Sequence, residues 1–203
     1  MENKGAPASL LVDFGRELHG GVQLASGGPS KKGMKVRLRF GESAAEAMAE
    51  LGERGACNDH AIRDDVVELP WFGTRELGNT GFRFVRVDLV SPGVLSLESI
   101  RAVSLMRPMP QLGAFTCSDE RLNQIWATAA RTLHLCCQEY IWDGIKRDRL
   151  VWMGDMHPEV MALMAVLKCR ASMSSVTFFS ILCRWRSTAW SCAAARGAWA
   201  RRQ

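Results

Sequence analysis

The chain has 203 residues, of which 47% are hydrophobic and 23% are charged. This composition is that of an ordinary globular protein and excludes a collagen-like, coiled-coil or wholly disordered chain. No apolar run approaches the ~18 residues that a transmembrane helix needs. The net charge of +5 is unevenly placed, because residues 160–203 contain basic but no acidic side chains and the rest of the chain is slightly acidic. We therefore expect neither a nucleic-acid nor a membrane partner.

The seven cysteines are odd in number and form no CxxC pair. This pattern fits neither a disulfide framework nor a zinc site, and it favours reduced, buried thiols. The four histidines form no HExxH pattern, so we expect no metal ion and no cofactor. The apolar stretch after Met1 is too short for a signal peptide, which predicts a cytoplasmic protein as the sequence is written. If the N-terminus is incomplete, a periplasmic or secreted location is expected instead.

Residues 10 to about 105 have the pattern of β structure. Val36, Leu38 and Phe40 alternate with arginines, which is the period of a half-buried strand. Glycine-rich breaks are expected at 20–21 and 78–81, a bulge near Phe84, and a short helical excursion over 44–51. Several short strands separated by turns predict an antiparallel β-sandwich. The expected strands cover 10–14, 21–25, 36–40, 65–69, 82–89 and 95–103.

A different period begins after the proline-containing segment 107–110, which is the expected domain boundary. Apolar residues recur at three- and four-residue steps from Leu122 to Tyr140, which predicts a long helix with Ser118 as its N-cap. A second helix is expected to begin at Pro158 and to run to Leu167, apolar on all sides.

The composition changes again over 171–203, which is rich in Ser, Arg, Trp and Ala and holds no acid. Three interpretations remain open for this stretch: a basic nucleic-acid-binding tail, a natural helical end, or a sequence that is not the protein's own continuation. We favour the third, an aberrant or disordered tail over 169–203, because a shifted reading frame gives a biased composition of this kind.

The segment between the two helices, residues 140–159, holds four carboxylates, three basic groups and two tryptophans. Tryptophan faces suit the apolar face of a sugar ring, and carboxylates suit its hydroxyl groups. One of these carboxylates is also a candidate for the acid group of a glycosidase. The alternative interpretation is a structural ion-pair loop.

This segment resembles the signature of the bacterial α-L-rhamnosidases, glycoside hydrolase family 78. The matching residues are Asp143-Gly-Ile-Lys-Arg147-Asp148-Arg149-Leu-Val-Trp152-Met-Gly154-Asp155. The run from Phe115 to Trp126 resembles the first helix of that family's catalytic domain. Three β segments look like the preceding sandwich: Val12-Asp-Phe-Gly15, Leu38-Arg-Phe-Gly-Glu42 and Gly81-Phe-Arg-Phe-Val85. The resemblance covers roughly residues 10–168.

The resemblance implies a six-hairpin glycosidase that hydrolyses terminal α-L-rhamnosides with inversion, acting on a rhamnose-containing glycoside or polysaccharide. It places Asp148 at the general acid, which in the family is usually a Glu. It places Asp143 and Asp155 at rhamnose-binding positions, Trp152 at the aromatic wall, and Arg147 at a substrate contact. The family's base is a Glu later in the helical barrel, and this sequence has no acid after Glu159.

The expected fold class is a multidomain β + α protein, an antiparallel β-sandwich followed by the first helices of an incomplete (α/α)6 barrel. The sandwich is expected over 8–107 and the N-terminal part of the catalytic domain over 112–168. We expect this polypeptide alone to be inactive or nearly so. The alternative hypothesis is a non-catalytic carbohydrate-binding or structural β-sandwich module.

Overall fold

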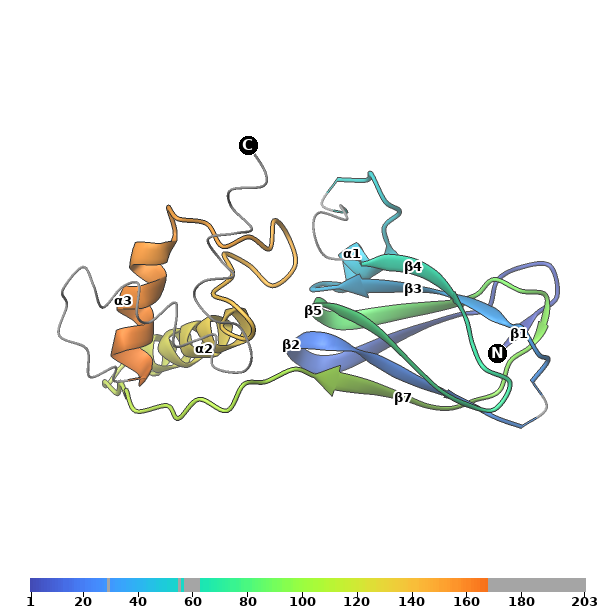
Figure 1. Ribbon diagram of the computed structural model, residues 1–203, viewed down its shortest axis with the longest axis horizontal. Helices are drawn as coiled ribbons and strands as arrows, with labels where there is room; N and C mark the ends of the chain where they lie inside the picture. Colours follow the sequence, from blue (N-terminus) through green and yellow to red (C-terminus); the bar gives the residue numbers. More distant parts are fainter. Residues whose placement is uncertain (29, 55, 57–62, 168–203) are drawn as a thin grey trace, which may run out of the picture.

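The computed structural model describes residues 1–28, 30–54, 56 and 63–167, so the tail predicted over 169–203 lies outside the described residues. Figure 1 shows a β-rich part and a helical part, joined by a segment that is neither helix nor strand over 105–119. Within the described ranges, no helix is both long enough and apolar enough to cross a membrane.

The β-rich part is built on one five-stranded antiparallel sheet. Two long central strands carry the shorter strands on their outer edges. The order across the sheet is β4 (Asp64–Glu68), β3 (Lys35–Gly41), β5 (Gly73–Leu89), β2 (Ser9–Ser26) and β7 (Leu97–Ser104). A second, two-stranded sheet pairs β1 (Glu2–Asn3) with β6 (Gly93–Val94).

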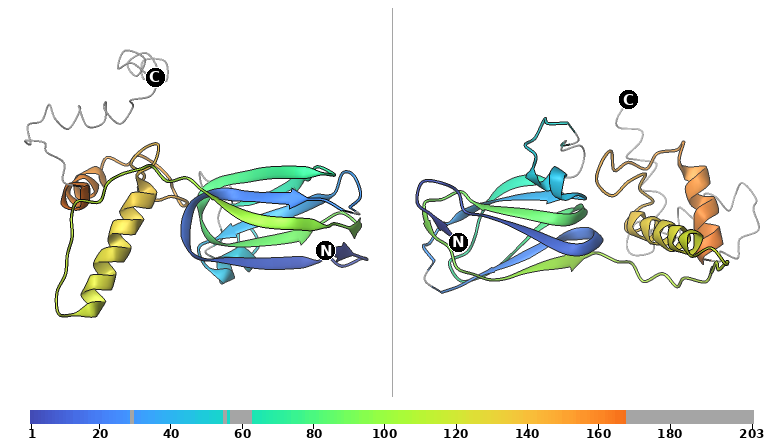
Figure 2. Two further views of the ribbon diagram at one scale, coloured as in Figure 1. Left: turned by 90° about the horizontal axis from the view of Figure 1, so that it is seen from below. Right: turned by 180° about the vertical axis from the view of Figure 1, so that it is seen from behind.

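The large sheet bends over on itself, so that its two halves face each other across the core. The β2–β5 register is broken between Asp13 and Leu18, where β2 has extra residues. On one side of this bulge β5 pairs with β3, and on the other side β2 pairs with β7. The halves meet closely, because a Cβ on Gly78 of β5 would lie 2.8 Å from the Phe40 ring of β3. Figure 2 shows the two resulting layers.

The core lies between these layers and follows the alternation that the sequence predicts. Val36, Leu38 and Phe40 are all buried, as are alternate residues of β5. Phe40 and Phe82 pack edge to face, with ring centroids 5.2 Å apart. The antiparallel β-rich fold predicted from the sequence is therefore confirmed, with both layers contributed by one continuous sheet.

Two local predictions for the β-rich part need correction, and a third is confirmed. The glycine pairs at 20–21 and 78–81 do not end strands but lie inside β2 and β5. The bulge does lie opposite Phe84, yet the extra residues belong to β2. The short helix forms as expected, with bounds Ala44–Met48 (α1).

The helical part contains α2 (Glu120–Cys136) and α3 (Met156–Leu167). Asp119, not Ser118, caps α2, because its side chain accepts the N–H of Arg121 at 2.9 Å. Helix α3 begins two residues before Pro158, which is tolerated there because the first-turn N–H groups have no intrahelical partner. The two helices share a small apolar cluster made of Cys137, Ile141, Met156 and Leu163.

The contact between the sheet halves predicts the effect of replacing Gly78. Gly78→Ala adds a methyl group against Phe40 at a backbone φ of +89°. Gly52 is a matched control, because its φ is +90° and a Cβ there would meet nothing within 4 Å. We expect Gly78→Ala to lower the free energy of unfolding by about 1–3 kcal/mol more than Gly52→Ala does. Urea unfolding curves of both variants measure this difference, and equal losses would contradict the packing of the two halves.

Candidate functional site

The loop between α2 and α3 carries the polar and aromatic segment and is closed by Asp143. The Asp143 Oδ1 atom accepts the backbone N–H groups of Gly144 and Leu150, both at 2.8 Å. The N–H of Asp143 in turn donates to the carbonyl of Leu150 at 3.0 Å. One oxygen of this carboxylate therefore holds the ends of the 143–150 loop together.

Four of the five predicted site residues line one pocket of about 280 Å³. These residues are Asp143, Arg147, Asp148 and Asp155. Trp152, the fifth, is not part of the lining. Its indole is more than half exposed and lies against Gly154. The signature residues thus gather around a small polar pocket, with the predicted aromatic wall outside it.

The backbone at the predicted acid has an unusual conformation. Asp148 and Arg149 have φ values of +58° and +47°, in the left-handed region that residues other than glycine rarely adopt. The carboxylate of Asp148 is partly exposed and lies 3.1 Å from the guanidinium of Arg147. Strained backbone of this kind persists only where the surrounding structure fixes it.

Arg149 helps to hold this backbone in place because its side chain binds to the β-sandwich. Its guanidinium donates to Asn79 Oδ1 at 2.9 Å and to the Asn79 carbonyl, and it lies over the Trp142 ring. His19 is buried beneath it, with Nδ1 donating to the Leu135 carbonyl at 3.0 Å and Nε2 lying 3.2 Å from Arg149. Burial lowers the pKa of His19, so the neutral ring can accept from Arg149.

The loop docks on the sandwich at two further points. The N–H of Gly81 donates to the carbonyl of Ile145 at 3.1 Å, and a Cβ on Gly81 would overlap the Ile145 side chain. The side chain of Lys146 is buried and forms an ion pair with Glu46 of α1. Sandwich residues therefore set the position of the loop that carries the predicted acid.

Glu17 lies at this junction with one carboxylate oxygen, Oε1, buried and without a hydrogen-bond partner. Burial raises the pKa of Glu17 to about 8, and the charges of Glu42 and Glu46 act in the same direction. Lys146 and Arg131 oppose the shift but do not cancel it. Arg131 is tied to the sandwich by donating to the Glu17 carbonyl at 2.5 Å.

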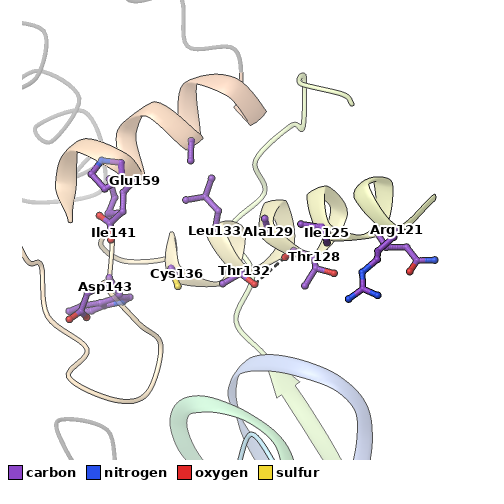
Figure 3. Close-up of a pocket in the computed structure, with 14 residues that line it drawn as sticks. Arg121, Ile125, Thr128, Ala129, Thr132, Leu133, Cys136, Ile141, Asp143 and Glu159 are labelled. Atoms are coloured by element: carbon purple, nitrogen blue, oxygen red, sulfur yellow. Dashed lines mark hydrogen bonds between the residues drawn. The ribbon is translucent and has the colours of Figure 1, made fainter. Parts of the chain in front are cut away.

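A larger groove of about 840 Å³ runs between α2 and α3. Figure 3 shows Arg121 at one end and Asp143 with Glu159 at the other. Burial, together with the charges of Asp155 and Asp143, raises the pKa of Glu159. Burial also raises the pKa of Cys136 to about 11, so this thiol is neutral and unreactive at ordinary pH.

Two carboxylates near the pocket were not assigned to the site from the sequence. Glu42 lines the pocket from the sandwich side, although the sequence marked it only as the end of a β segment. Glu159, to which the sequence assigns no role, lines the larger groove with Asp143, and the charges of Asp143 and Asp155 act on it. No sequence motif links Glu42 to a segment about 100 residues later, so Glu42 can be assigned to the pocket only from the folded structure. Among the described residues, no group of three His, Cys, Asp or Glu side chains could hold a metal ion.

The β-rich part is thus followed by two helices, and the loop between them carries the acidic, tryptophan-containing signature. Residues 110–177 match the family model for the bacterial alpha-L-rhamnosidase six-hairpin glycosidase domain. This match begins near the expected boundary at 112 and runs past residue 168, where the resemblance was expected to end. No curated protein matches the chain.

Three solved structures resemble the fold. A rhamnosidase from Klebsiella oxytoca with rhamnose bound has a TM-score of 0.69 at 22% identity, covering 80% of this chain and 34% of its own. The alpha-L-rhamnosidase from Dictyoglumus thermophilum has a TM-score of 0.58 at 25% identity, with coverages of 78% and 18%. The enzyme from Aspergillus terreus has a TM-score of 0.52 at 25% identity, with coverages of 75% and 18%.

The chain therefore resembles the bacterial α-L-rhamnosidases in sequence over residues 110–177 and resembles solved rhamnosidases in fold over most of its length. It spans about a third of the length of the Klebsiella enzyme and about a fifth of the other two. The predicted resemblance to the α-L-rhamnosidases is thus confirmed, and so is the fold class of β-sandwich followed by helices.

The raised pKa of Glu17 predicts how stability depends on pH. As pH rises above the ordinary value of 4.5, the unfolded chain loses this proton first, whereas the folded chain keeps it until about pH 8. The stabilisation that Glu17 contributes to the folded state is therefore complete below pH 4.5, and it is lost progressively as the pH rises from 4.5 to about 8. Because the side chain is partly solvated, we expect a loss of about 1–2 kcal/mol.

Urea unfolding at several pH values between 5 and 8 measures this loss. Glu17→Gln should flatten the curve, whereas Glu76→Gln, on an exposed part of β5, should leave it unchanged. Parallel curves for wild type and Glu17→Gln would show that Glu17 titrates normally in the folded chain.

Proposed function

We propose that the pocket of Asp143, Arg147, Asp148 and Asp155 binds a terminal α-L-rhamnosyl residue. One observation carries the proposal: the signature residues line a single pocket in a chain whose family match and fold are those of α-L-rhamnosidases. Its volume of about 280 Å³ lies just below the range of about 300–1,000 Å³ typical of ligand pockets, which favours a ligand as small as one sugar residue. The Klebsiella relative has rhamnose bound.

The proposed roles follow the chemistry of each group. Asp148 is the general acid that protonates the glycosidic oxygen of the leaving group, and Arg147 positions its carboxyl from 3.1 Å. Asp155 accepts hydrogen bonds from sugar hydroxyl groups. Asp143 does the same with its second oxygen, because Oδ1 already closes the loop. Trp152 covers the apolar face of the sugar from outside the pocket.

The reaction proposed for the whole family member is hydrolysis with inversion at the anomeric carbon. That mechanism needs a second carboxylate about 6.5–9.5 Å from the acid, with room for the attacking water. The resemblance assigns this base to a Glu later in the helical barrel, and residues 160–203 contain no Asp or Glu. We therefore propose that the 203-residue polypeptide binds rhamnosides but hydrolyses them little or not at all.

The division of the chain into domains is part of the same proposal. We assign residues 8–107 to the sandwich and 112–168 to the beginning of the catalytic domain, with the tail expected over 169–203 starting later, because the family match extends to residue 177. The competing function is a non-catalytic carbohydrate-binding or structural module built on the sandwich. The two differ in the location of the sugar, which is the 143–155 loop in the first case and the sandwich in the second.

Calorimetric titration of the 203-residue chain with L-rhamnose tests the proposal. We expect binding by the wild type and a loss of about tenfold or more in affinity for Asp155→Asn, because a charged hydrogen-bond acceptor is removed. Asp65→Asn, at an exposed position on β4, is the control and should bind normally. Release of nitrophenol from p-nitrophenyl α-L-rhamnoside should remain at background.

Each result has a distinct meaning. If the wild type gives no heat with L-rhamnose, the proposed site is wrong. If Asp155→Asn binds as the wild type does, the sugar lies elsewhere and the module hypothesis gains. If nitrophenol is released and Asp148→Asn abolishes the release, the polypeptide is active and the proposal of inactivity is wrong.

A further inference from the structure

We propose that Glu42 of the sandwich is a specificity-determining residue of the same pocket, where its carboxylate accepts a hydrogen bond from a hydroxyl group of the bound sugar. The inference rests on the proposed function, because it concerns the same rhamnosyl site. It adds a residue that lies outside the signature and outside the segment that matches the family model.

Glu42 lies at the one place where the sandwich forms part of the pocket wall. All other lining residues belong to 143–155, whereas Glu42 follows the last residue of β3. Because the pocket is small, at about 280 Å³, we expect its lining side chains to lie close to the same bound sugar. Glu42 therefore brings a carboxylate to this wall from the sandwich and not from the loop.

The backbone around Glu42 is held rigidly. A Cβ on Gly41 would lie 2.6 Å from the Ala47 nitrogen, so the turn from β3 into α1 is tight. Ser43 caps α1 by accepting the Glu46 N–H at 3.2 Å. The buried Arg63 donates to the carbonyl of Glu46 at 2.6 Å and to that of Phe40 at 3.4 Å. The turn that carries Glu42 is thus a fixed element and not a freely moving loop.

Glu46 links this turn directly to the site loop. Its Oε2 atom accepts the backbone N–H of Glu42 at 2.8 Å, and its Oε1 atom forms the ion pair with Lys146. The Glu46 carboxylate therefore fixes the backbone of Glu42 on one side and the side chain of Lys146, which precedes Arg147, on the other. The sandwich side and the loop side of the pocket are therefore held in a fixed relative position without a ligand.

The side chain of Glu42 contributes nothing visible to this framework. Its backbone N–H is used, but within the described part of the chain its carboxylate has no hydrogen-bond or ion-pair partner. Its negative charge raises the pKa of Glu17, which is a cost to the folded state. A carboxylate that has no partner within the described residues and that lines this small pocket is well placed to accept from a hydroxyl group.

Calorimetry of the full 203-residue chain with methyl α-L-rhamnopyranoside tests this inference. Glu42→Gln keeps the shape and the backbone N–H, and it should weaken binding by about tenfold. Glu76→Gln, which makes the same charge change on an exposed part of β5, should bind as the wild type does. Thermal melting of both variants checks that the fold is retained.

The 2-, 3- and 4-deoxy analogues of the same glycoside separate a ligand contact from a structural effect. In the wild type, removal of the hydroxyl group that Glu42 accepts should weaken binding, and in Glu42→Gln the same removal should cost much less. A purely structural role would lower the affinity for all analogues by one common factor. That result, or unchanged affinity of Glu42→Gln for the parent glycoside, would overturn the inference and leave the proposed function intact. Absence of binding by the wild type would overturn both.

Discussion

The docking of the 143–150 loop on the sandwich is the constraint on which the candidate site depends. The hydrogen bond from Gly81 to Ile145, the buried Lys146–Glu46 ion pair and the contacts of Arg149 with Asn79 all join the two parts. The loop contains no helix or strand of its own. Its left-handed residues at 148 and 149 need support from outside, and the sandwich supplies it. The β-rich part is therefore a structural component of the site.

This support is electrostatically costly. Lys146 is removed from water and paired with a single carboxylate, while Glu17 has one buried oxygen without a hydrogen-bond donor. Buried charges of this kind add little to stability, because desolvation consumes most of the attraction. Such charges do fix the position of the loop, because moving Lys146 away from Glu46 would leave a buried charge without a partner. A site that must hold several carboxylates around one small pocket benefits from such positional control.

Much of the fold was predictable because local patterns determine it, and the rest depends on distant partners. The alternation at Val36, Leu38 and Phe40 correctly indicated a strand, although Arg39 on its other face is buried as well and pairs with Asp88. The glycines at 20–21 were misread as a break, because a glycine in a turn and a glycine in a crowded strand look alike in sequence. A Cβ on Gly21 would lie 2.1 Å from the Leu77 carbonyl oxygen, which requires glycine inside the strand. In the same way, the signature predicted four pocket residues, but Glu42 enters the pocket only through the folded chain.

The uncovered apolar stripe of α2 shows how strongly the helical part relies on the same junction. Leu122 and Ile125 belong to a regular stripe, yet they are 47% and 54% exposed among the described residues. The α2–α3 pair buries only the small cluster around Cys137 and Met156. Because burial of apolar area is the main source of stability, so small a cluster holds two helices weakly. The contacts of His19 with Leu135 and of Arg131 with Glu17 therefore stabilise α2 as well as the site, which couples the folding of the helices to the geometry of the pocket.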